Sequence, residues 1–206
     1  MTAAGILLAA GGGVRMGEPK ALLRHADGRR WVETSLLALL EGGCDPVGVV
    51  VGAQAEAVRA VMAADAYRSV TVLENARWPA GMGGSLRLAL DWCSELDPSV
   101  TAAVVMLVDT PGVGAVVVRR LLGLGGDAAV LARASYGGDP HDHPVLLGRQ
   151  HWPALRETCA GQHGARGYLE RHRPRLIDCT GLGTGADVDS GSDLVQTWAA
   201  QHPAEP

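Results

Sequence analysis

Short apolar runs alternate with stretches of helical spacing along most of this chain, and this alternation constrains the fold more than any other feature. Apolar runs predict buried strands at residues 5–10, 47–51, 70–73 and 101–108, and shorter runs predict strands at 128–131 and 144–147. Helical spacing of apolar residues predicts helices at 32–40, 53–64, 85–96 and 115–122. Such alternation is typical of βαβ units, so we expect an α/β fold with a mostly parallel sheet.

The length and composition fit one domain. A single core can grow to about 250 residues before a chain divides, and this chain has 206 residues. We therefore predict one domain over residues 1–200 and a frayed tail over 201–206. Apolar residues make up 47% of the chain and Phe is absent, so the core must be built from Leu, Val and Ala, which suits helices packed on a parallel sheet.

Charge, hydropathy and cysteine spacing exclude several classes of protein. A net charge of −4 argues against a general nucleic-acid binder, which would show a basic stripe. The first apolar run is too short for a signal peptide or a membrane span. The four cysteines include no C-x-x-C pair, which favours reduced thiols in a cytoplasmic protein. We expect neither a nucleic-acid nor a membrane partner.

A glycine-rich loop follows the first predicted strand, in the sequence LLAAGGGVRMGEPK (7–20). Ligands of open α/β sheets bind at the carboxyl edge of the strands, and glycines allow backbone N–H groups to approach phosphate oxygens. The loop departs from the P-loop, because Glu18 replaces the lysine after Gly17, and from the dinucleotide fingerprint, because Met16 replaces its third glycine. Either the loop holds an extended phosphate chain between Arg15 and Lys20, or it is a plain turn with two solvated cations.

Carboxylates at the expected edge of the sheet predict a metal site. Asp109 closes the fourth predicted strand, and Asp187 and Asp189 lie two residues apart, on one face of an extended segment. Mg²⁺ prefers carboxylate and phosphate oxygens. We predict that these three residues hold Mg²⁺, although Asp109 is also a candidate helix cap, as are the polar residues that follow Asp189.

The loop LAAGGGVRMGEPK resembles the L-A-[AG]-G-x-S-x-R-M-G-x-x-K signature of MobA-like nucleotidyltransferases, with Gly13 where the family commonly has serine. Further segments resemble the family's motifs in the family's order: NARWPAGMGGS (75–85), VDTP (108–111), DPHDHPVLL (139–147), GQHGARGYL (161–169) and DVDSGSDL (187–194). The family implies a Rossmann-like three-layer sandwich with helices on both faces, of the nucleotide-diphospho-sugar transferase type.

The resemblance implies an activity and a set of nucleotide-binding residues. The Ala9-Ala10-Gly11 form of the loop is similar to the molybdenum-cofactor cytidylyltransferase branch, which transfers CMP from CTP to molybdopterin and releases pyrophosphate. Arg15 and Lys20 would stabilise charge as catalytic residues. The nucleotide would contact Leu8, Ala9, Ala10, Gly11, Gly12, Gly13, Arg15, Lys20, Gly81 and Ser85.

Two residues are candidates for the acceptor side of the site. His143 lies in a loop with a histidine two residues before it, and Arg166 follows Gly164-Ala165 and is a candidate helix start. For each residue an alternative stays open: His143 as a loop histidine bonded to the backbone, and Arg166 as a surface arginine.

Three alternatives remain open. The same framework could use GTP or another phosphorylated small-metabolite acceptor. A molybdopterin carrier or insertion chaperone would bind the cofactor without turnover and pass it to a molybdoenzyme apo-protein. A nucleotide-binding regulator would bind CTP and lack an acceptor site.

Overall fold

The computed structural model describes residues 2–14, 16–125, 127–137, 143–159, 161 and 164–189. Within these ranges, seven strands form one sheet in the order β3-β2-β1-β4-β6-β5-β7. The strands are β1 (Thr2–Ala9), β2 (Val47–Val51), β3 (Val70–Glu74), β4 (Val100–Leu107), β5 (Leu131–Ser135), β6 (Val145–Gly148) and β7 (Arg175–Asp178). The helices are α1 (Trp31–Gly42), α2 (Ala55–Met62), α3 (Met82–Glu95), α4 (Ala115–Leu122), α5 (Trp152–Thr158) and α6 (Arg166–His172).

The sheet is mostly parallel, which confirms the prediction. Strand β1 pairs in parallel with both β2 and β4, and β2–β3 and β5–β7 are parallel pairs. Strand β6 runs antiparallel to both of its neighbours, β4 and β5. The chain between β5 and β6 is too short to hold a helical crossover, and an antiparallel pair requires none.

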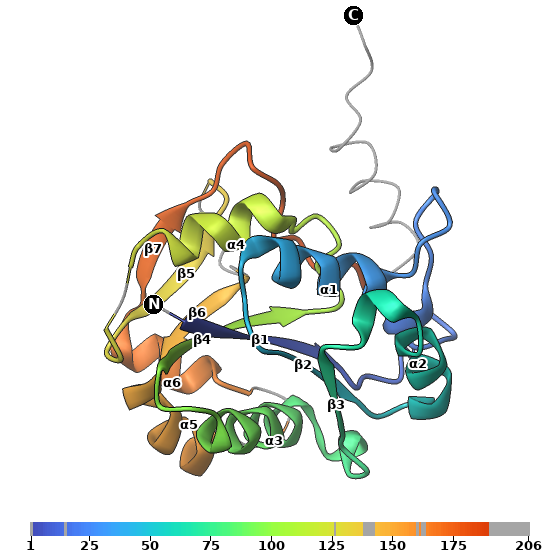
Figure 1. Ribbon diagram of the computed structural model, residues 1–206, viewed down its shortest axis with the longest axis horizontal. Coiled ribbons are helices and arrows are strands. Elements are labelled where there is room, and N and C mark those ends of the chain that lie inside the picture. The colour runs from blue at the N-terminus through green and yellow to red at the C-terminus, as the bar shows by residue number, and fades with distance from the viewer. Residues whose placement is uncertain are drawn as a thin grey trace, which may run out of the picture.

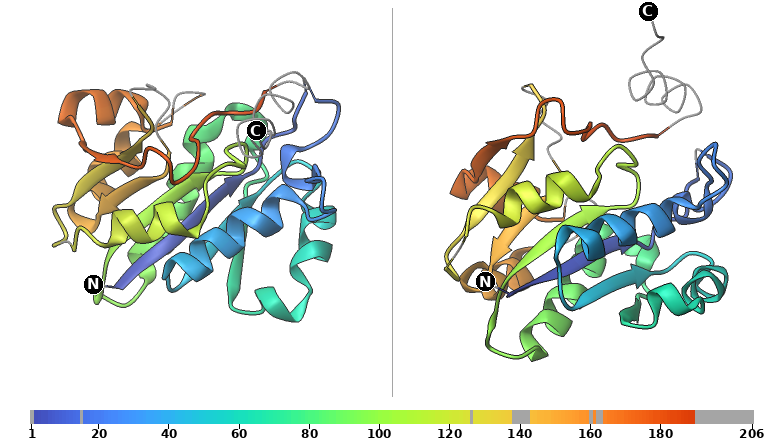
Figure 2. Two further views of the ribbon diagram at one scale, coloured as in Figure 1. Left: turned by 90° about the horizontal axis from the view of Figure 1, so that it is seen from above. Right: turned by 45° about the horizontal axis from the view of Figure 1, so that its top comes forward.

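Helices cover both faces of the sheet, so the predicted three-layer sandwich is confirmed (Figures 1 and 2). Buried side chains of α1, α2 and α4 pack in one cluster on one face, and those of α3, α5 and α6 pack in a second cluster on the other. Successive residues of β1 point to opposite faces. Leu7 therefore joins the first cluster, and Ile6 and Leu8 join the second.

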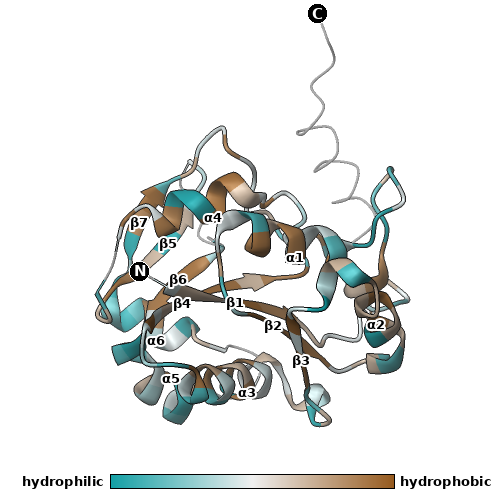
Figure 3. Cartoon of the chain, in the orientation of Figure 1, coloured by the Kyte–Doolittle hydropathy of each residue, from teal (hydrophilic) through white to brown (hydrophobic). Residues whose placement is uncertain are grey.

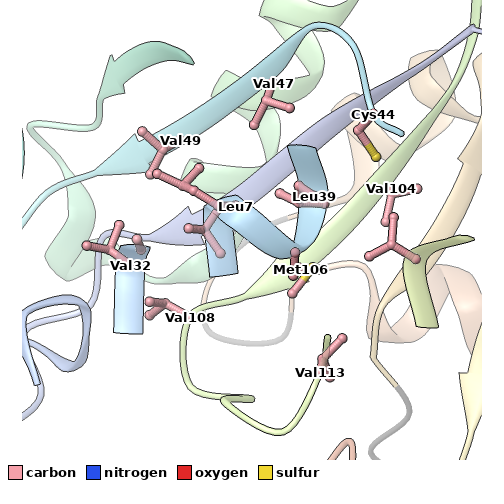
Figure 4. Close-up of a cluster of buried hydrophobic side chains, with 14 of the residues drawn as sticks. Leu7, Val32, Leu39, Cys44, Val47, Val49, Val104, Met106, Val108 and Val113 are labelled. Atoms are coloured by element: carbon pink, nitrogen blue, oxygen red, sulfur yellow. The ribbon is translucent and has the colours of Figure 1, made fainter. Parts of the chain in front are cut away.

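The central strands are apolar along their length because both of their faces are covered (Figure 3). Leu7 of β1 lies between Val49 of β2 and Met106 of β4 in the register of the sheet. Figure 4 shows these three side chains together with Val32 and Leu39 of α1, and all five are fully buried. This cluster packs α1 onto β1, β2 and β4.

Most predicted elements lie where the sequence placed them. The observed bounds of β2 and α4 equal the predicted ones, and β1, β3, β4, β6, α1, α2 and α3 overlap their predictions. The predicted start of a helix at Arg166 is confirmed by α6. Helix α5 and strand β7 were not predicted from the sequence.

The strand predicted at residues 128–131 is wrong, since β5 spans Leu131–Ser135. Asp127 explains the difference, because its carboxylate accepts a hydrogen bond from the N–H of Ala129 at 2.9 Å and its carbonyl accepts one from the N–H of Val130. An aspartate that bonds the backbone two residues on forms a turn. The apolar run therefore begins inside that turn, and the strand starts after it.

No helix in the described part of the chain is long and apolar enough to cross a membrane. No disulfide joins the four cysteines, all of which are buried. The predicted tail at residues 201–206 lies outside the described residues.

Candidate nucleotide and metal site

The glycine loop and Asp109 lie side by side at the carboxyl edge of the sheet. Strands β1 and β4 are neighbours, with Leu8 opposite Leu107, and the N–H of Val108 donates to the carbonyl of Leu8 at 3.2 Å. The loop leaves β1 at the point where Asp109 follows β4. The fold therefore brings two predicted parts of the site together at the edge where α/β proteins bind ligands.

Lys20 joins three distant parts of the chain. It begins a short 3-10 turn after Pro19, and its Nζ donates to Asp109 Oδ2 at 2.9 Å and to Asp189 Oδ1 at 2.5 Å. The Lys20 side chain is 15% exposed, that of Asp109 25% and that of Asp189 47%. One ammonium group thus bonds two carboxylates in a partly buried place.

The electrostatics of Lys20 follow from this position. Burial is the largest single influence and lowers the pKa of Lys20, but attraction to Asp109 and hydrogen bonds to Asp189 and Asp109 together outweigh it. The pKa of Lys20 is therefore raised above its ordinary value of 10.5. Lys20 is a fixed positive charge at neutral pH.

A backbone bond holds the segment after β7 against β4. The N–H of Val188 donates to the carbonyl of Asp109 at 2.9 Å, and the N–H of Thr184 donates to that of Gly112 at 3.2 Å. Val188 is fully buried in the core, so Asp187 and Asp189 on either side of it turn the other way, as the i, i+2 spacing predicts. Asp189 reaches Lys20, whereas the side chain of Asp187 is exposed.

The three acids do not form a ready metal site. Among the described residues, no group of three Asp, Glu, His or Cys side chains is arranged to hold a metal ion. However, Asp109 Oδ1 is buried with no hydrogen-bond partner among the described residues, and a buried acceptor without a partner is costly. Carboxylate oxygens are the donors that Mg²⁺ and Mn²⁺ prefer. Asp109 with Asp189 therefore fits a divalent cation at the place where Lys20 now bonds both.

Gly13 has a conformation that only glycine suits. Its φ is +59°, and a Cβ atom there would overlap the carbonyl oxygen of Glu18. The N–H of Met16 donates to the carbonyl of Gly13 at 2.8 Å, which closes the turn. The family's common serine at this position would not fit this loop, because its Cβ would overlap the Glu18 carbonyl. The glycine therefore permits a different loop conformation.

The segment at 75–85, which includes the predicted nucleotide contacts Gly81 and Ser85, packs against the glycine loop through Trp78. A Cβ on Gly12 would lie 2.8 Å from the ring of Trp78, and one on Gly52 would lie 2.6 Å from Trp78 Cβ, so this ring packs closely against both glycines. Only the fold shows that Trp78 contacts the loop, because nothing in the sequence places residue 78 beside residue 12. Gly81, with a φ of +115°, precedes the first residue of α3.

Ser85 is a buried link within that segment. Its hydroxyl accepts a hydrogen bond from Asn75 Nδ2 at 2.9 Å, and Asn75 Oδ1 accepts one from the N–H of Arg77 at 3.0 Å. Ser85 is only 3% exposed. The pair shapes the turn between β3 and α3, so Asn75, which the sequence reasoning did not select, belongs with Ser85.

The two residues predicted for the acceptor side lie in different surroundings. Arg166 is exposed and pairs with Glu170 one helical turn later, at 2.9 Å, which fits the surface alternative. The carbonyl of His143 accepts a hydrogen bond from the Tyr136 hydroxyl at 2.9 Å. The Tyr136 ring packs against Gly185, so His143 lies beside the segment that leads to Asp189. Arg15 lies outside the described residues.

A parallel sheet that ends on a glycine loop is the architecture of α/β nucleotide-binding proteins. The chain belongs to the family described as the MobA-like NTP transferase domain, which matches residues 5–176. The match ends before Asp187 and Asp189, so the argument for these two acids rests on the geometry described above.

Two relatives resemble this chain over nearly all of its length. The chain is 40% identical over 195 residues to a nicotine blue oxidoreductase of Paenarthrobacter nicotinovorans, covering 90% of this chain and 91% of that protein. It is 28% identical to the solved structure of Rv0371c from Mycobacterium tuberculosis H37Rv, with a TM-score of 0.77 over 95% of this chain and 97% of that one.

Two further solved structures are similar to this chain. Rv0371c was also solved in complex with manganese, with a TM-score of 0.70 and 28% identity over 96% of this chain and 98% of that one. A nucleotidyl transferase from Methanothermobacter thermautotroptrophicus has a TM-score of 0.75 at 19% identity over 95% of each chain, which shows a shared fold.

Proposed function

We propose that this chain is a divalent-metal-dependent nucleotidyltransferase that transfers CMP from CTP to a molybdopterin-type acceptor and releases pyrophosphate. The observation that carries the proposal is the contact of Lys20 with Asp109 and Asp189 directly beside the glycine loop. It unites a cation for phosphates and oxygen ligands for a metal at one edge of the sheet. The manganese complex of Rv0371c supports a divalent ion in a protein of this fold.

The reaction needs positioning and charge stabilisation more than it needs a base. A phosphate oxygen of the acceptor attacks the α-phosphorus of CTP, a new P–O bond forms, and the bond to the bridging oxygen of the leaving pyrophosphate breaks. Because the acceptor phosphate is already a nucleophile, no side chain has to remove a proton. A bound divalent ion supplies charge neutralisation on the phosphate oxygens.

Each part of the site has a role in this reaction. The loop around Gly11 to Gly13 presents its backbone to the phosphates, and Lys20 adds a positive charge where negative charge develops. Asp109 with Asp189, and Asp187 from the same segment, would hold the metal. Gly81 and the Asn75–Ser85 link shape the turn beside the base, and His143 lies on the acceptor side. We place Mg²⁺ as the physiological ion.

The choice of CTP and molybdopterin rests on the Ala9-Ala10-Gly11 form of the loop. GTP, or another phosphorylated acceptor, would use the same phosphate chemistry. The choice is tested by pyrophosphate release with each of the four nucleotides, with and without molybdopterin and Mg²⁺. Turnover only with CTP and molybdopterin supports the proposal, and turnover with GTP or another acceptor replaces it. Binding of molybdopterin without turnover would instead indicate a carrier that delivers the cofactor to a molybdoenzyme or its chaperone.

Two substitutions test the chemistry itself. We expect Lys20→Ala and Asp109→Asn each to reduce pyrophosphate release at least 100-fold, because the first removes a positive charge at the transferring phosphate and the second removes a proposed ligand of the metal. Asp65 and Arg68 form an exposed ion pair at 2.8 Å on the connection between α2 and β3 and provide matched controls. Asp65→Asn and Arg68→Ala should retain activity. Full activity in Lys20→Ala or Asp109→Asn, with the fold intact by circular dichroism, would refute the assignment.

A second candidate function follows from the relative that is 40% identical over nearly the whole chain, which is named an oxidoreductase. In that case the site would bind a compound related to nicotine blue, which would accept electrons from a separate reductant, and NADH and NADPH serve as the test reductants. The assay is loss of absorbance of NADH or NADPH in the presence of nicotine blue. Metal-independent turnover that survives Asp109→Asn would favour this function over nucleotidyl transfer.

A further inference from the structure

We infer that in the nucleotide-free protein the Lys20 ammonium occupies the place of the divalent ion, so that metal binds only as Lys20 leaves Asp109 and Asp189. This inference rests on the proposed function and deepens it, because it states how the site changes between its empty and loaded forms. It makes Lys20 a built-in competitor of the metal as well as a ligand of phosphate.

The contacts of Lys20 are the basis of this inference. Its Nζ is 2.9 Å from Asp109 Oδ2 and 2.5 Å from Asp189 Oδ1. A Mg²⁺ ion binds carboxylate oxygens at about 2.1 Å, so an ion shared by these same two oxygens would lie very close to the ammonium. Two cations in one partly buried place repel each other strongly.

Lys20 leaves part of the site's binding capacity unused. Asp109 Oδ2 is bonded, but Asp109 Oδ1 is buried and has no hydrogen-bond partner among the described residues. A divalent ion brings both more charge and more coordination positions than an ammonium, either directly or through bound water. The carboxylate is therefore better matched to a metal than to the lysine that now occupies it.

The carboxylates keep their places without Lys20. The hydrogen bond from the N–H of Val188 to the carbonyl of Asp109 uses only backbone atoms, and Val188 is anchored in the core. Removing the Lys20 side chain therefore frees the two acids without separating their segments.

The glycine loop provides an alternative partner for Lys20. Lys20 directly follows this loop in the chain, so phosphates held by the loop offer it anionic oxygens. The nucleotide would draw the ammonium away as the metal enters. Metal and nucleotide should consequently bind far more tightly together than the metal binds alone.

Mn²⁺ binding to the full chain without nucleotide, followed by electron paramagnetic resonance, tests the exchange. We expect Lys20→Met to bind Mn²⁺ at least tenfold more tightly than the wild type. Arg24→Met is the matched control, because Arg24 lies in the same region and donates to the carbonyl of Gly28, away from the acids; its Mn²⁺ affinity should equal that of the wild type. Adding Asp109→Asn to Lys20→Met should remove the gain.

The outcomes separate this inference from the proposed function. If the wild type binds Mn²⁺ and releases pyrophosphate but Lys20→Met binds Mn²⁺ no more tightly, the exchange is wrong and the transferase assignment stands. If neither protein binds Mn²⁺, even with CTP, both are wrong. An equal gain in Arg24→Met would reduce the effect to general electrostatics and would also overturn the exchange.

A second measurement on the wild type avoids any folding defect of the variant. Acetylation of Lys20 by a small acetylating reagent that reacts with amines, quantified by mass spectrometry, should be slow in the metal-free protein. It should accelerate severalfold when Mn²⁺ is added. Displacement from the two carboxylates frees the amine from its hydrogen bonds and exposes it to the reagent. A labelling rate that Mn²⁺ leaves unchanged would contradict the inference.

Discussion

At the scale of single residues, Gly13 determines the shape of the glycine loop. Gly13 and Gly17 both have positive φ angles, +59° and +79°, but only at Gly13 would a Cβ meet backbone. The left-handed conformation itself costs a non-glycine residue roughly 1–2 kcal/mol. Alanine at either position would pay the cost of the left-handed conformation, but only alanine at Gly13 would also overlap the backbone. The two positions are therefore a matched pair.

We expect Gly13→Ala to weaken nucleotide binding at least tenfold, because the loop must move to separate the new Cβ from the carbonyl of Glu18. Gly17→Ala, with open space around its Cβ position, should weaken it less. Isothermal titration calorimetry with CTP measures both. Equal losses at the two positions would show that the overlap at Gly13 is relieved without changing the site.

Sequence reasoning at this scale found the charged residues but not their pairing. Lys20 and Asp189 are 169 positions apart, and nothing in their local sequences indicates that they touch. The link between Asn75 and Ser85 was equally hidden, because a buried serine and an exposed one look alike in sequence. Contacts of this kind depend on how the fold brings distant segments together, and the local sequence does not indicate that arrangement.

At the scale of secondary structure, continuous apolar runs were the most reliable signal. The run VGVVV predicted β2 with its bounds, because both faces of a central strand are covered and every residue is buried. Strand β7 (Arg175–Asp178) lies at the edge of the sheet with only Ile177 buried, so it carries no such run. The antiparallel direction of β6 depends on the connection from β5 and not on the strand's own residues.

The packing of α1 against α4 depends on a small residue. Gly42, in the last turn of α1, is buried, and a Cβ there would overlap the side chain of Val118 in α4. Gly167, in α6, is exposed and has open space around the same position. Alanine favours a helix over glycine by up to about 1 kcal/mol, whereas overpacking a core costs about 1–3 kcal/mol.

We therefore expect opposite effects from the same substitution. Gly42→Ala should lower the free energy of unfolding by about 1–2 kcal/mol, and Gly167→Ala should raise it by up to about 1 kcal/mol. Urea denaturation followed by circular dichroism measures both values. Stabilisation by Gly42→Ala would mean that α1 and α4 can separate without loss.

At the scale of the whole molecule, two buried thiols should lower the free energy of unfolding as the pH becomes alkaline. Burial raises the pKa of Cys44 and of Cys93 from 9.0 to about 12, with Arg149 opposing the shift slightly at Cys93. The unfolded chain loses these protons near pH 9 and the folded chain keeps them. Their contribution to stability is complete below pH 9 and is lost between pH 9 and about 12.

The slope of this loss is about 1.4 kcal/mol per pH unit for each thiol. Between pH 9 and 11, the free energy of unfolding of Cys93→Ala should therefore fall less steeply than that of the wild type by this amount. The variant is also less stable at pH 7 because of the cavity it creates, so the comparison concerns slopes and not absolute values. Parallel curves would show that the Cys93 thiol ionises as readily in the folded protein as in the unfolded one.

The return of the segment after β7 to Asp109 has a consequence for biosynthesis. The glycine loop, Lys20 and Asp109 all leave the ribosome well before Asp189 does, so a nascent chain carries the cationic half of the centre and one acid without its counterpart. Until translation passes residue 189, the ammonium has a single carboxylate to bind. The cluster of Lys20, Asp109 and Asp189 is therefore completed only late in synthesis. A premature stop after residue 176 would release a chain with the family's matched region but without Asp189.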